Sequence, residues 1–376
     1  MIFLEDKIVH IFSKWDSNTY NMAKFFQNNM LMDNLDFLVW ETRDGIIYND
    51  PRLLAFLNIK YLPDRETKII NKISRIIKIL KFLNEKNKIV IHSFKFAKGN
   101  LKIILVLLFF CKKITWIKTN NDFYESMIFD NKFKSEIYNY AIRTLKKKIN
   151  TIYNRNFYNL KNEVFTFLND EYIRCLDILH KGNCNSLSMK NYLNILIGEN
   201  GLKRNKHLLI VDKLTNIDKE FNVLFFMNYA MLNEYGYNST STYRSKVIEY
   251  ASRKLNKKVI GLNKKNVKCN NYFNLLNNID AAVFAEHRFH NNNLVFYFLY
   301  LGKMVFIPKD SELYKFLRYK GLYVFDLEDV SVIVNKYSEF KNILQENMSN
   351  IWLKNYIHNI EQDKIWKKTL ENIQNS

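Results

Sequence analysis

The sequence predicts an α/β protein built from two Rossmann-like domains of parallel strands that face a cleft. Its 376 residues are enough for two domains that each bury a core, and 48% of them are hydrophobic. Short apolar runs alternate with longer segments of helical spacing, which is typical of parallel strands covered by helices. The chain has only 9 Gly and 3 Pro, fewer than an all-β protein with many turns needs.

The first half of the chain shows strand patterns with helical patterns between them. The predicted strands are Asp6–Phe12, Leu35–Trp40, Lys88–His92 and Ile114–Lys118. The predicted helices are Ser17–Asn29, Arg65–Asn84, Asn100–Cys111 and Lys134–Lys148. Each strand is a short apolar run, whereas each helix repeats its apolar residues every three or four positions. From Asn150 to Gly182 the apolar clusters, such as Tyr172–Leu179, fit strands and helices equally well.

The second half of the chain repeats this alternation. The predicted strands are Leu193–Ile197, Asn222–Met227, Lys258–Leu262, Ala281–Ala285, Lys303–Ile307 and Leu322–Phe325. The polar stretch Lys181–Asn191 separates the halves, so domains are expected at residues 1–184 and 185–346. Residues 347–376 are expected to form helices that return to the first domain. Because open α/β sheets bind ligands at the carboxyl ends of their strands, both domains are expected to contribute to one site.

The formal net charge of +20 permits a nucleic acid, an anionic membrane surface or an acidic substrate as partner. The basic residues are dispersed and form no RNA-recognition, helix-turn-helix or zinc-finger pattern, so no nucleic acid is expected. The four cysteines, Cys111, Cys175, Cys184 and Cys269, lie far apart without a CxxC pair or a His cluster. We therefore expect a reduced, cytoplasmic protein with neither a metal nor another cofactor.

The N-terminus and the most apolar run bear on membranes. Glu5 and Asp6 stand where a signal peptide would carry positive charge, so no export signal is expected. The run Ile103–Cys111 is about half of the roughly 20 residues that cross a bilayer as a helix. No transmembrane segment is expected, and Lys112, Lys113 and Lys146–Lys148 are instead expected to dock on an anionic membrane surface.

The stretch Tyr192–Leu214 predicts a buried strand, a turn and a basic helix, a unit that can bind an anion. Its Gly and Asn residues turn a chain cheaply, and Asn205 is expected to cap the helix, whose N-terminus attracts negative charge. The residues predicted to contact the anion are Gly198, Asn200, Gly201, Arg204 and His207. An ordinary strand-to-helix turn with solvated basic residues explains this stretch equally well.

A second loop, within Phe284–Pro308, follows a predicted strand and opens an apolar helix. Its polar residues can offer a cation and amides to a phosphate or a sugar hydroxyl, and these are Arg288, Asn291, Asn292 and Asn293. The alternative is an Asn-rich cap in an Asn-rich protein. Two such loops in one domain favour a nucleotide-diphosphate site. Neither loop is a Walker A or a GxGxxG motif, which disfavours P-loop NTPases and NAD enzymes.

Several motifs together resemble one family. Ile195–His207 reads ILIGENGLKRNKH and matches, with the same spacing, the stretch ILVGNSGDRSNEH. That stretch belongs to the TDP-N-acetylfucosamine:lipid II N-acetylfucosaminyltransferases, which are inverting glycosyltransferases of the two-Rossmann-domain (GT-B) fold. Val9–Phe12 followed by Asp16 resembles the family's His-bearing first strand and the Asp-containing loop after it. Trp116 with Asn121–Glu125 resembles its Trp-bearing strand and GADLYE loop.

Two segments depart from that family. His92-Ser93 stands where the family has His-Gly, and Phe284–Asn293 resembles its FARQQGIG loop with Glu286 and His287 added. Asn291 and Asn293 replace both glycines of that loop. Asn tolerates a positive φ but fills space that Gly leaves open, so the departure falls where the donor sugar is bound.

The resemblance implies an inverting, metal-independent glycosyltransferase. It would move a deoxyamino sugar from a nucleotide diphosphate, such as TDP-N-acetylfucosamine, to a lipid-linked or lipopolysaccharide-type glycan at the inner face of the cell membrane. The first domain would bind the acceptor and the second domain the donor. The candidates for the base that deprotonates the acceptor hydroxyl are Asp16, Asp122, His92 and Glu125, with the two aspartates favoured. A sugar-nucleotide epimerase of the same fold and a non-catalytic, basic nucleic-acid-binding protein are the alternatives.

Overall fold

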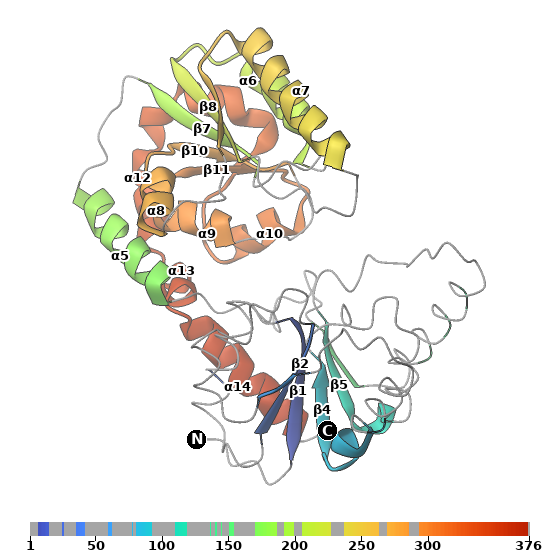
Figure 1. Ribbon diagram of the computed structural model, residues 1–376. Coiled ribbons are helices and arrows are strands. Elements are labelled where there is room, and N and C mark those ends of the chain that lie inside the picture. Colours follow the sequence, from blue (N-terminus) through green and yellow to red (C-terminus); the bar gives the residue numbers. More distant parts are fainter. Residues whose placement is uncertain are drawn as a thin grey trace. The chain divides into compact units, whose positions relative to one another are not determined.

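The protein forms two compact units in a computed structural model (Figure 1). The residues that the structure describes are 7–14, 25, 35–41, 59–61, 77, 80–91, 110–118, 136, 140, 144, 150–153, 170–185, 192–198, 205–226, 237–262, 269–285 and 293–374. Unit 1 comprises Met1–Asn169 and Gln362–Ser376, and unit 2 comprises Asp170–Glu361. The chain therefore passes from unit 1 to unit 2 and back, with its C-terminal segment in unit 1.

Unit 1 contains a parallel sheet with six described strands. They are β1 (Ile8–Lys14), β2 (Leu35–Glu41), β3 (Ile59–Tyr61), β4 (Lys88–Ile91), β5 (Ile114–Lys118) and β6 (Asn150–Tyr153). The order across the sheet is β3-β2-β1-β4-β5-β6, and each neighbouring pair is parallel. This is the strand order of a Rossmann fold, in which the chain reverses direction across the sheet between β1 and β4. The sequence analysis missed β3 and left β6 ambiguous, because three or four residues are too few to show a period.

Among the described residues of sheet 1, the buried side chains of β1 and β4 include one imidazole. Val9, Ile89 and Val90 are fully buried, and His10 of β1 is buried among them. Burial lowers the pKa of His10 from its usual 6.5 to about 3, so this side chain is neutral at physiological pH. The amino end of the sheet is held by an ion pair between Lys86 and Asp36, both of which are largely buried.

Unit 2 contains a second parallel sheet with the same topology. Its strands are β7 (Leu193–Ile197), β8 (Phe221–Phe226), β9 (Val259–Leu262), β10 (Ala281–Val283), β11 (Met304–Ile307) and β12 (Phe325–Asp326). The order is β12-β11-β10-β7-β8-β9, so the reversal falls between β7 and β10. The predicted strands of this half lie within two residues of the observed ones except at the last. There, the backbone N–H of Tyr323 donates to the buried side-chain amide of Asn347 at 2.7 Å, and the same amide donates to the Tyr323 carbonyl oxygen at 2.8 Å. The strand therefore begins only at Phe325.

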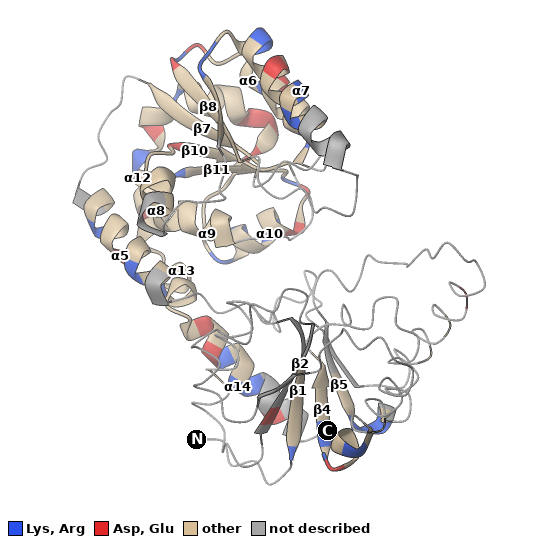
Figure 2. Ribbon diagram, in the orientation of Figure 1, with Lys and Arg blue, Asp and Glu red and all other residues tan. Residues whose placement is uncertain are grey.

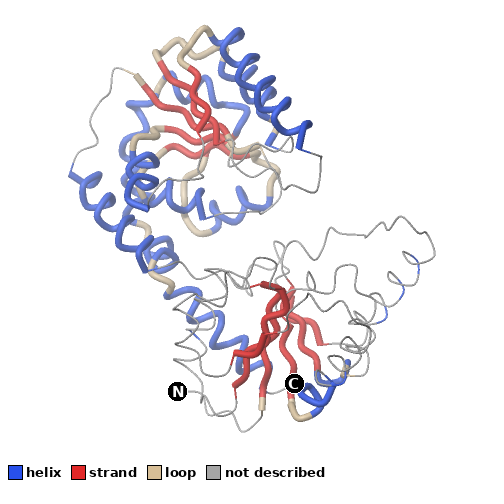
Figure 3. The backbone as a smooth tube through the Cα atoms, in the orientation of Figure 1, coloured by secondary structure: helices blue, strands red, loops and turns tan. Residues whose placement is uncertain are grey.

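Helices cover both faces of sheet 2 (Figure 3). They are α5 (Asp170–Asn185), α6 (His207–Leu214), α7 (Tyr237–Leu255), α8 (Cys269–Asn277), α9 (Asn293–Tyr300), α10 (Glu312–Tyr319), α11 (Val330–Asn335), α12 (Lys341–Ser349) and α13 (Ile351–Ile357). Short 3-10 turns lie at Leu327–Asp329 and Tyr337–Phe340 in this unit and at Cys111–Lys113 in unit 1. The last helix, α14 (Ile360–Gln374), lies mostly in unit 1, whereas residues 347–361 belong to unit 2.

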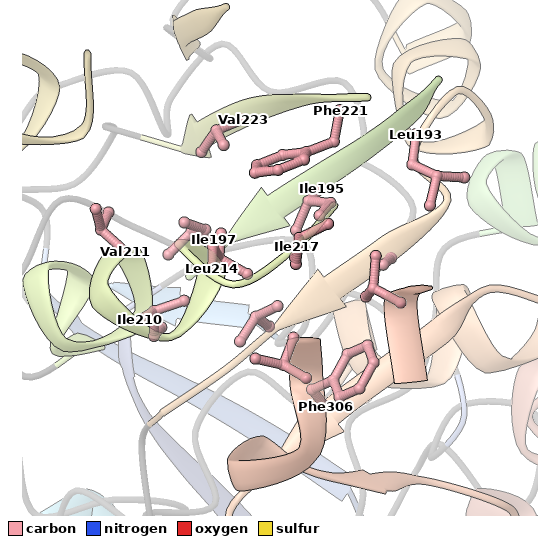
Figure 4. Packing of buried hydrophobic residues seen from close by; sticks show 14 of the residues in the cluster. Leu193, Ile195, Ile197, Ile210, Val211, Leu214, Ile217, Phe221, Val223 and Phe306 are labelled. Carbon is pink, nitrogen blue, oxygen red and sulfur yellow. The ribbon is translucent and has the colours of Figure 1, made fainter. Parts of the chain in front are cut away.

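One face of sheet 2 packs against α6, α7 and α11. Ile210 and Leu214 of α6 lie next to Ile197 of β7 (Figure 4), and the cluster extends to α7 and α11. On the other face, Tyr272 of α8 contacts Phe226 with ring centroids 6.2 Å apart. The two layers of helices bury the strands on both faces, which explains why their sequences read as continuous apolar runs rather than as alternating ones.

The helix α5 packs on unit 2. His180 stacks on Tyr300 of α9 with ring centroids 4.2 Å apart, and the Tyr300 hydroxyl donates to Asp177 at 2.8 Å. His358, directly after α13, contacts the other oxygen of Asp177 at 3.1 Å. The domain limit predicted near residue 184 falls inside α5, whereas the compact units divide between Asn169 and Asp170.

None of the described helices is long and apolar enough to cross a membrane.

Gly302→Ala is expected to destabilise unit 2, because Gly302 has a φ of 67° and an added Cβ would lie 2.5 Å from Sδ of the buried Met348. A left-handed conformation costs a non-Gly residue about 1–2 kcal/mol before the contact is counted. Gly182→Ala is the matched control, since a Cβ there meets no atom within 4 Å and α5 is helical at that point. Gly182→Ala should stabilise the folded protein by about 0.5–1 kcal/mol. Thermal unfolding that shifts both variants in the same direction would contradict this prediction.

Candidate functional site

The candidate site lies at the carboxyl ends of β7 and β10, where the strand order of sheet 2 reverses. Ile197, the last residue of β7, is in register with Val283, the last residue of β10. At such a reversal the loops that follow the two strands diverge, and ligands of open α/β sheets bind in the space between them. Both loops singled out in the sequence start at these two strand ends.

Gly198 turns the chain as it leaves β7. It has a φ of 67°, and its N–H donates to the carbonyl oxygen of Val283 at 2.9 Å. A Cβ at this position would lie 2.9 Å from Nε2 of His207 and 3.3 Å from Cβ of Asn205. The position therefore requires glycine for both its conformation and its space. Because the Gly198 N–H already bonds to β10, a phosphate would depend on other amides of the turn.

His207, the first residue of α6, is fully buried beneath that turn. Its Nδ1 shares a hydrogen bond of 3.1 Å with the hydroxyl of Tyr243 from α7, and its ring meets the ring of Phe225 edge-on. Burial raises the pKa of Tyr243, an effect that a hydrogen bond from the His207 backbone partly offsets, so the phenol remains neutral. In this structure His207 supports the turn by packing, and its predicted contact with a donor stays a prediction.

The cap of α6 differs from our prediction. Lys206, not Asn205, is the N-cap residue, with φ 49° and ψ 40° and no hydrogen bond from its side chain to the helix. Asn205 is instead buried next to Gly198. No acidic residue stands in the first turn of α6. The first N–H groups of a helix lack intrahelical acceptors, so this end favours an anion.

Asn293 begins α9 on the β10 side of the site. Its amide oxygen accepts a hydrogen bond of 2.8 Å from the hydroxyl of Tyr356, a buried residue of α13. This bond orients the amide, and only the Asn293 nitrogen remains to donate to a ligand. Tyr356 and Tyr243 were both missed by the sequence analysis, because they lie in helices far along the chain from the loops they support.

The remaining predicted site residues lie outside the described part of the chain, and their roles stay predictions. They are Asp16, His92, Asp122, Glu125, Asn200, Gly201, Arg204, Arg288, Asn291 and Asn292.

The described side chains indicate neither a metal centre nor a basic stripe. No group of three or more His, Cys, Asp or Glu among the described residues could hold a metal ion. Lys and Arg share the described helices with Asp and Glu, as on α7, where Lys246 and Arg253 flank Glu249 (Figure 2). Within this part of the chain, the basic residues are dispersed as the sequence suggested.

No protein-family model and no curated protein sequence matches the chain. Solved structures do match it over nearly its whole length. HepE of Anabaena in complex with UDP and glucose is 12% identical with a TM-score of 0.54, over 98% of this chain and 100% of that chain. A glycosyltransferase from Rickettsia africae ESF-5 is 13% identical with a TM-score of 0.59, over 98% and 97%. A structure described as trehalose-6-phosphate from E. coli bound with UDP-2-fluoro glucose is 10% identical with a TM-score of 0.56, over 98% of this chain and 98% of that chain.

These observations define a two-Rossmann-domain protein, because each unit contains a parallel sheet of order 3-2-1-4-5-6. Its particular form is the GT-B fold, which the chain shares with the structures just named. The predicted fold class is thereby confirmed.

Proposed function

We propose that this protein is a glycosyltransferase that takes its sugar from a nucleotide diphosphate. One observation carries the proposal: the turn at Gly198 and the N-terminus of α6 form an anion-favouring unit at the reversal point of sheet 2. HepE, which has the same fold, binds UDP and UDP-glucose. The resemblance of Ile195–His207 to a GT-B family supports binding of the donor diphosphate over this same unit.

The reaction needs a proton acceptor and a site for the leaving diphosphate. A base removes the proton of the acceptor hydroxyl while its oxygen bonds to the anomeric carbon. The bond from that carbon to the diphosphate oxygen breaks, and the departing diphosphate takes the electron pair. Negative charge grows on the diphosphate in the transition state, where cations and N–H groups stabilise it. On the donor side, Arg204 and Arg288 are the cations proposed from the sequence.

Topology ranks the candidates for the base. The strand order of sheet 1 reverses between β1 and β4, so the loops after these two strands border the proposed acceptor site. Asp16 follows the end of β1 by two residues, and His92 directly follows β4. Asp122 and Glu125 come after β5, one strand further from the reversal. Topology therefore ranks Asp16 and His92 ahead of Asp122 and Glu125. We favour Asp16 as the base, and we keep Asp122 second on chemical grounds, because a lone histidine at a strand end is usually structural.

The finer assignments rest on the family resemblance. We propose a deoxyamino sugar as the transferred group, with TDP-N-acetylfucosamine as one donor, a lipid-linked or lipopolysaccharide-type glycan as acceptor, and inversion at the anomeric carbon. A trehalose-6-phosphate synthase of this fold has been used to study glycosyl transfer with retention. The fold thus admits either stereochemistry, and the anomeric configuration of the product tests the proposed inversion.

A lipid-linked acceptor implies a protein that works at the inner face of the membrane. Of the basic residues expected to dock there, Lys112 is exposed. The ammonium group of Lys113 instead donates to the carbonyl oxygens of Lys86 and Asn84 at 2.9 and 3.3 Å, which leaves it a smaller part in docking. Lys146–Lys148 lie outside the described residues.

Two measurements test the proposed function. A thermal-shift screen against UDP, dTDP, GDP and ADP should reveal a diphosphate that raises the melting temperature, because a ligand of the native state stabilises it by mass action. With the matching sugar nucleotide, free diphosphate should then be released only when a glycolipid acceptor is added. Sugar epimerisation without an acceptor would instead indicate an epimerase. Binding of nucleic acid but of no nucleotide diphosphate would overturn the proposal.

A further inference from the structure

One arginine lies where the packing of α7 calls for an apolar residue. Arg244 precedes Val247, Ala251 and Leu255 by three, seven and eleven positions, so all four lie on one face of the helix. The other three are buried, and they belong to the core between α7 and sheet 2. Arg244 therefore stands on the side of α7 that faces the sheet.

Arg244 also lies at the end of the sheet that holds the candidate site. The helix α7 connects the carboxyl end of β8 to the amino end of the parallel strand β9, so it runs back along the sheet. Eleven residues of helix separate Leu255 from Arg244, about 16 Å at 1.5 Å per residue. This distance nearly matches the length of β8, six residues at about 3.3 Å each, so Arg244 lies level with the carboxyl end of that strand. An independent contact agrees, since the neighbouring Tyr243 bonds to His207 beneath the Gly198 turn.

Arg244 is partly buried, and its Nε atom is buried without a hydrogen-bond partner. The described carboxylates of α6 and of the loop after it are engaged elsewhere. Asp212 contacts Tyr250 and Lys254, and Glu220 contacts Lys257. A buried N–H group without an acceptor costs stability, and a ligand that accepts a hydrogen bond from this Nε would remove that cost.

We propose that Arg244 binds the diphosphate of the donor, an inference that rests on the proposed function of this site. A guanidinium donates two parallel N–H bonds to phosphate oxygens, and its charge offsets the charge that grows on the leaving group. Val247, Ala251 and Leu255 hold α7 against the sheet, and Tyr243 ties its first half to the turn after β7. The sequence does carry a signal for this role, which is an arginine within the apolar stripe of a helix. This signal was not among our sequence-based predictions.

The test compares Arg244→Gln with Arg253→Gln by calorimetric titration. Arg253 is an exposed residue at the opposite end of the same helix, so the control removes the same charge away from the site. The probes are the nucleoside diphosphate that binds best in the screen, and inorganic pyrophosphate. Arg244→Gln should weaken binding of the diphosphate by roughly 10- to 100-fold, the loss expected for one hydrogen-bonded charge. Arg253→Gln should bind like the wild type.

The melting temperature without ligand separates a binding role from a structural one. Because Arg244 has an unpartnered Nε, Arg244→Gln should melt no lower than the wild type, and only its ligand-induced shift should shrink. Arg244→Lys, which keeps the charge but loses the fork, should recover part of the affinity. A variant that melts lower yet binds diphosphate with unchanged affinity would overturn the inference.

The pyrophosphate arm keeps this inference distinct from the proposed function. If the wild type binds a nucleoside diphosphate and Arg244→Gln binds it equally well, the inference fails while the proposed function stands. If the wild type binds pyrophosphate but no nucleotide, and Arg244→Gln loses it, Arg244 is an anion ligand and the proposed donor is wrong. Binding of neither probe by the wild type overturns both.

Discussion

Asp16→Asn is expected to lower turnover by roughly 10²- to 10⁴-fold, the usual loss when a general base is removed. The substitution keeps the size of the side chain but takes away the proton acceptor. Asp16 follows β1, the strand at which the order of sheet 1 reverses, so it belongs to the loop that we expect to face the acceptor hydroxyl. Affinity for the nucleotide diphosphate should barely change, since the proposed donor site is in unit 2.

Steady-state kinetics with saturating donor and acceptor, together with titration of the diphosphate, measures both quantities. Asp122→Asn is the matched comparison, an equal change in the loop after β5. If Asp16→Asn keeps near-normal turnover while Asp122→Asn loses it, the base is Asp122. Should both variants remain active, neither aspartate is the base, and His92 and Glu125 are the next candidates.

Wild-type unit 1 is expected to lose up to roughly 5 kcal/mol of stability as the pH falls from 6.5 towards 3, because of His10 alone. The imidazole has a pKa of about 3 in the folded protein and its usual value near 6.5 when unfolded. Above pH 6.5 His10 is neutral in both the folded and the unfolded protein, so its titration costs no stability there. Below pH 6.5 the unfolded chain takes up a proton that the folded protein does not, which favours unfolding. Each pH unit in this window costs about 1.4 kcal/mol.

His10→Gln removes this titration and should flatten the pH dependence of unfolding. Denaturant unfolding of both proteins at pH 7.5, 6.0 and 5.0 measures the difference, in a range where carboxylates remain mostly ionised. The variant itself will be less stable at pH 7.5, so the result to compare is the slope with pH and not the absolute stability. Equal slopes for the two proteins would mean that His10 is protonated in the folded state, contrary to its complete burial.

Much of the fold could be predicted because its signals are local. The runs Leu193–Ile197 and Ile114–Lys118 are mostly apolar, and both are strands with the predicted limits. The ambiguous stretch Tyr172–Leu179 is part of α5. Its pattern was hard to read because α5 leaves Tyr172 and Ile178 exposed. Where an element is short or its exposed face is apolar, periodicity alone cannot assign it.

The turn at the candidate site was predictable in outline but not in detail. A glycine directly after a buried strand indicated a turn, and Gly198 indeed has a positive φ. The same pattern predicted Asn205 as the helix cap, a position that Lys206 occupies. Local preference was overruled because Asn205 packs beside Gly198, where burial decides which residue points inward.

The sequence by itself determined most of the described strands, the α/β class of the chain and the strand ends at which the candidate site's loops begin. These follow from the spacing of apolar residues and from turn-forming residues, which act within a few positions along the chain. Only the tertiary structure decided that Tyr243 contacts His207, that Tyr356 bonds to Asn293 and that Arg244 lies on the face of α7 whose other residues are buried. The first two contacts join residues 36 and 63 positions apart, and they exist only because parallel sheets bring the ends of distant strands together.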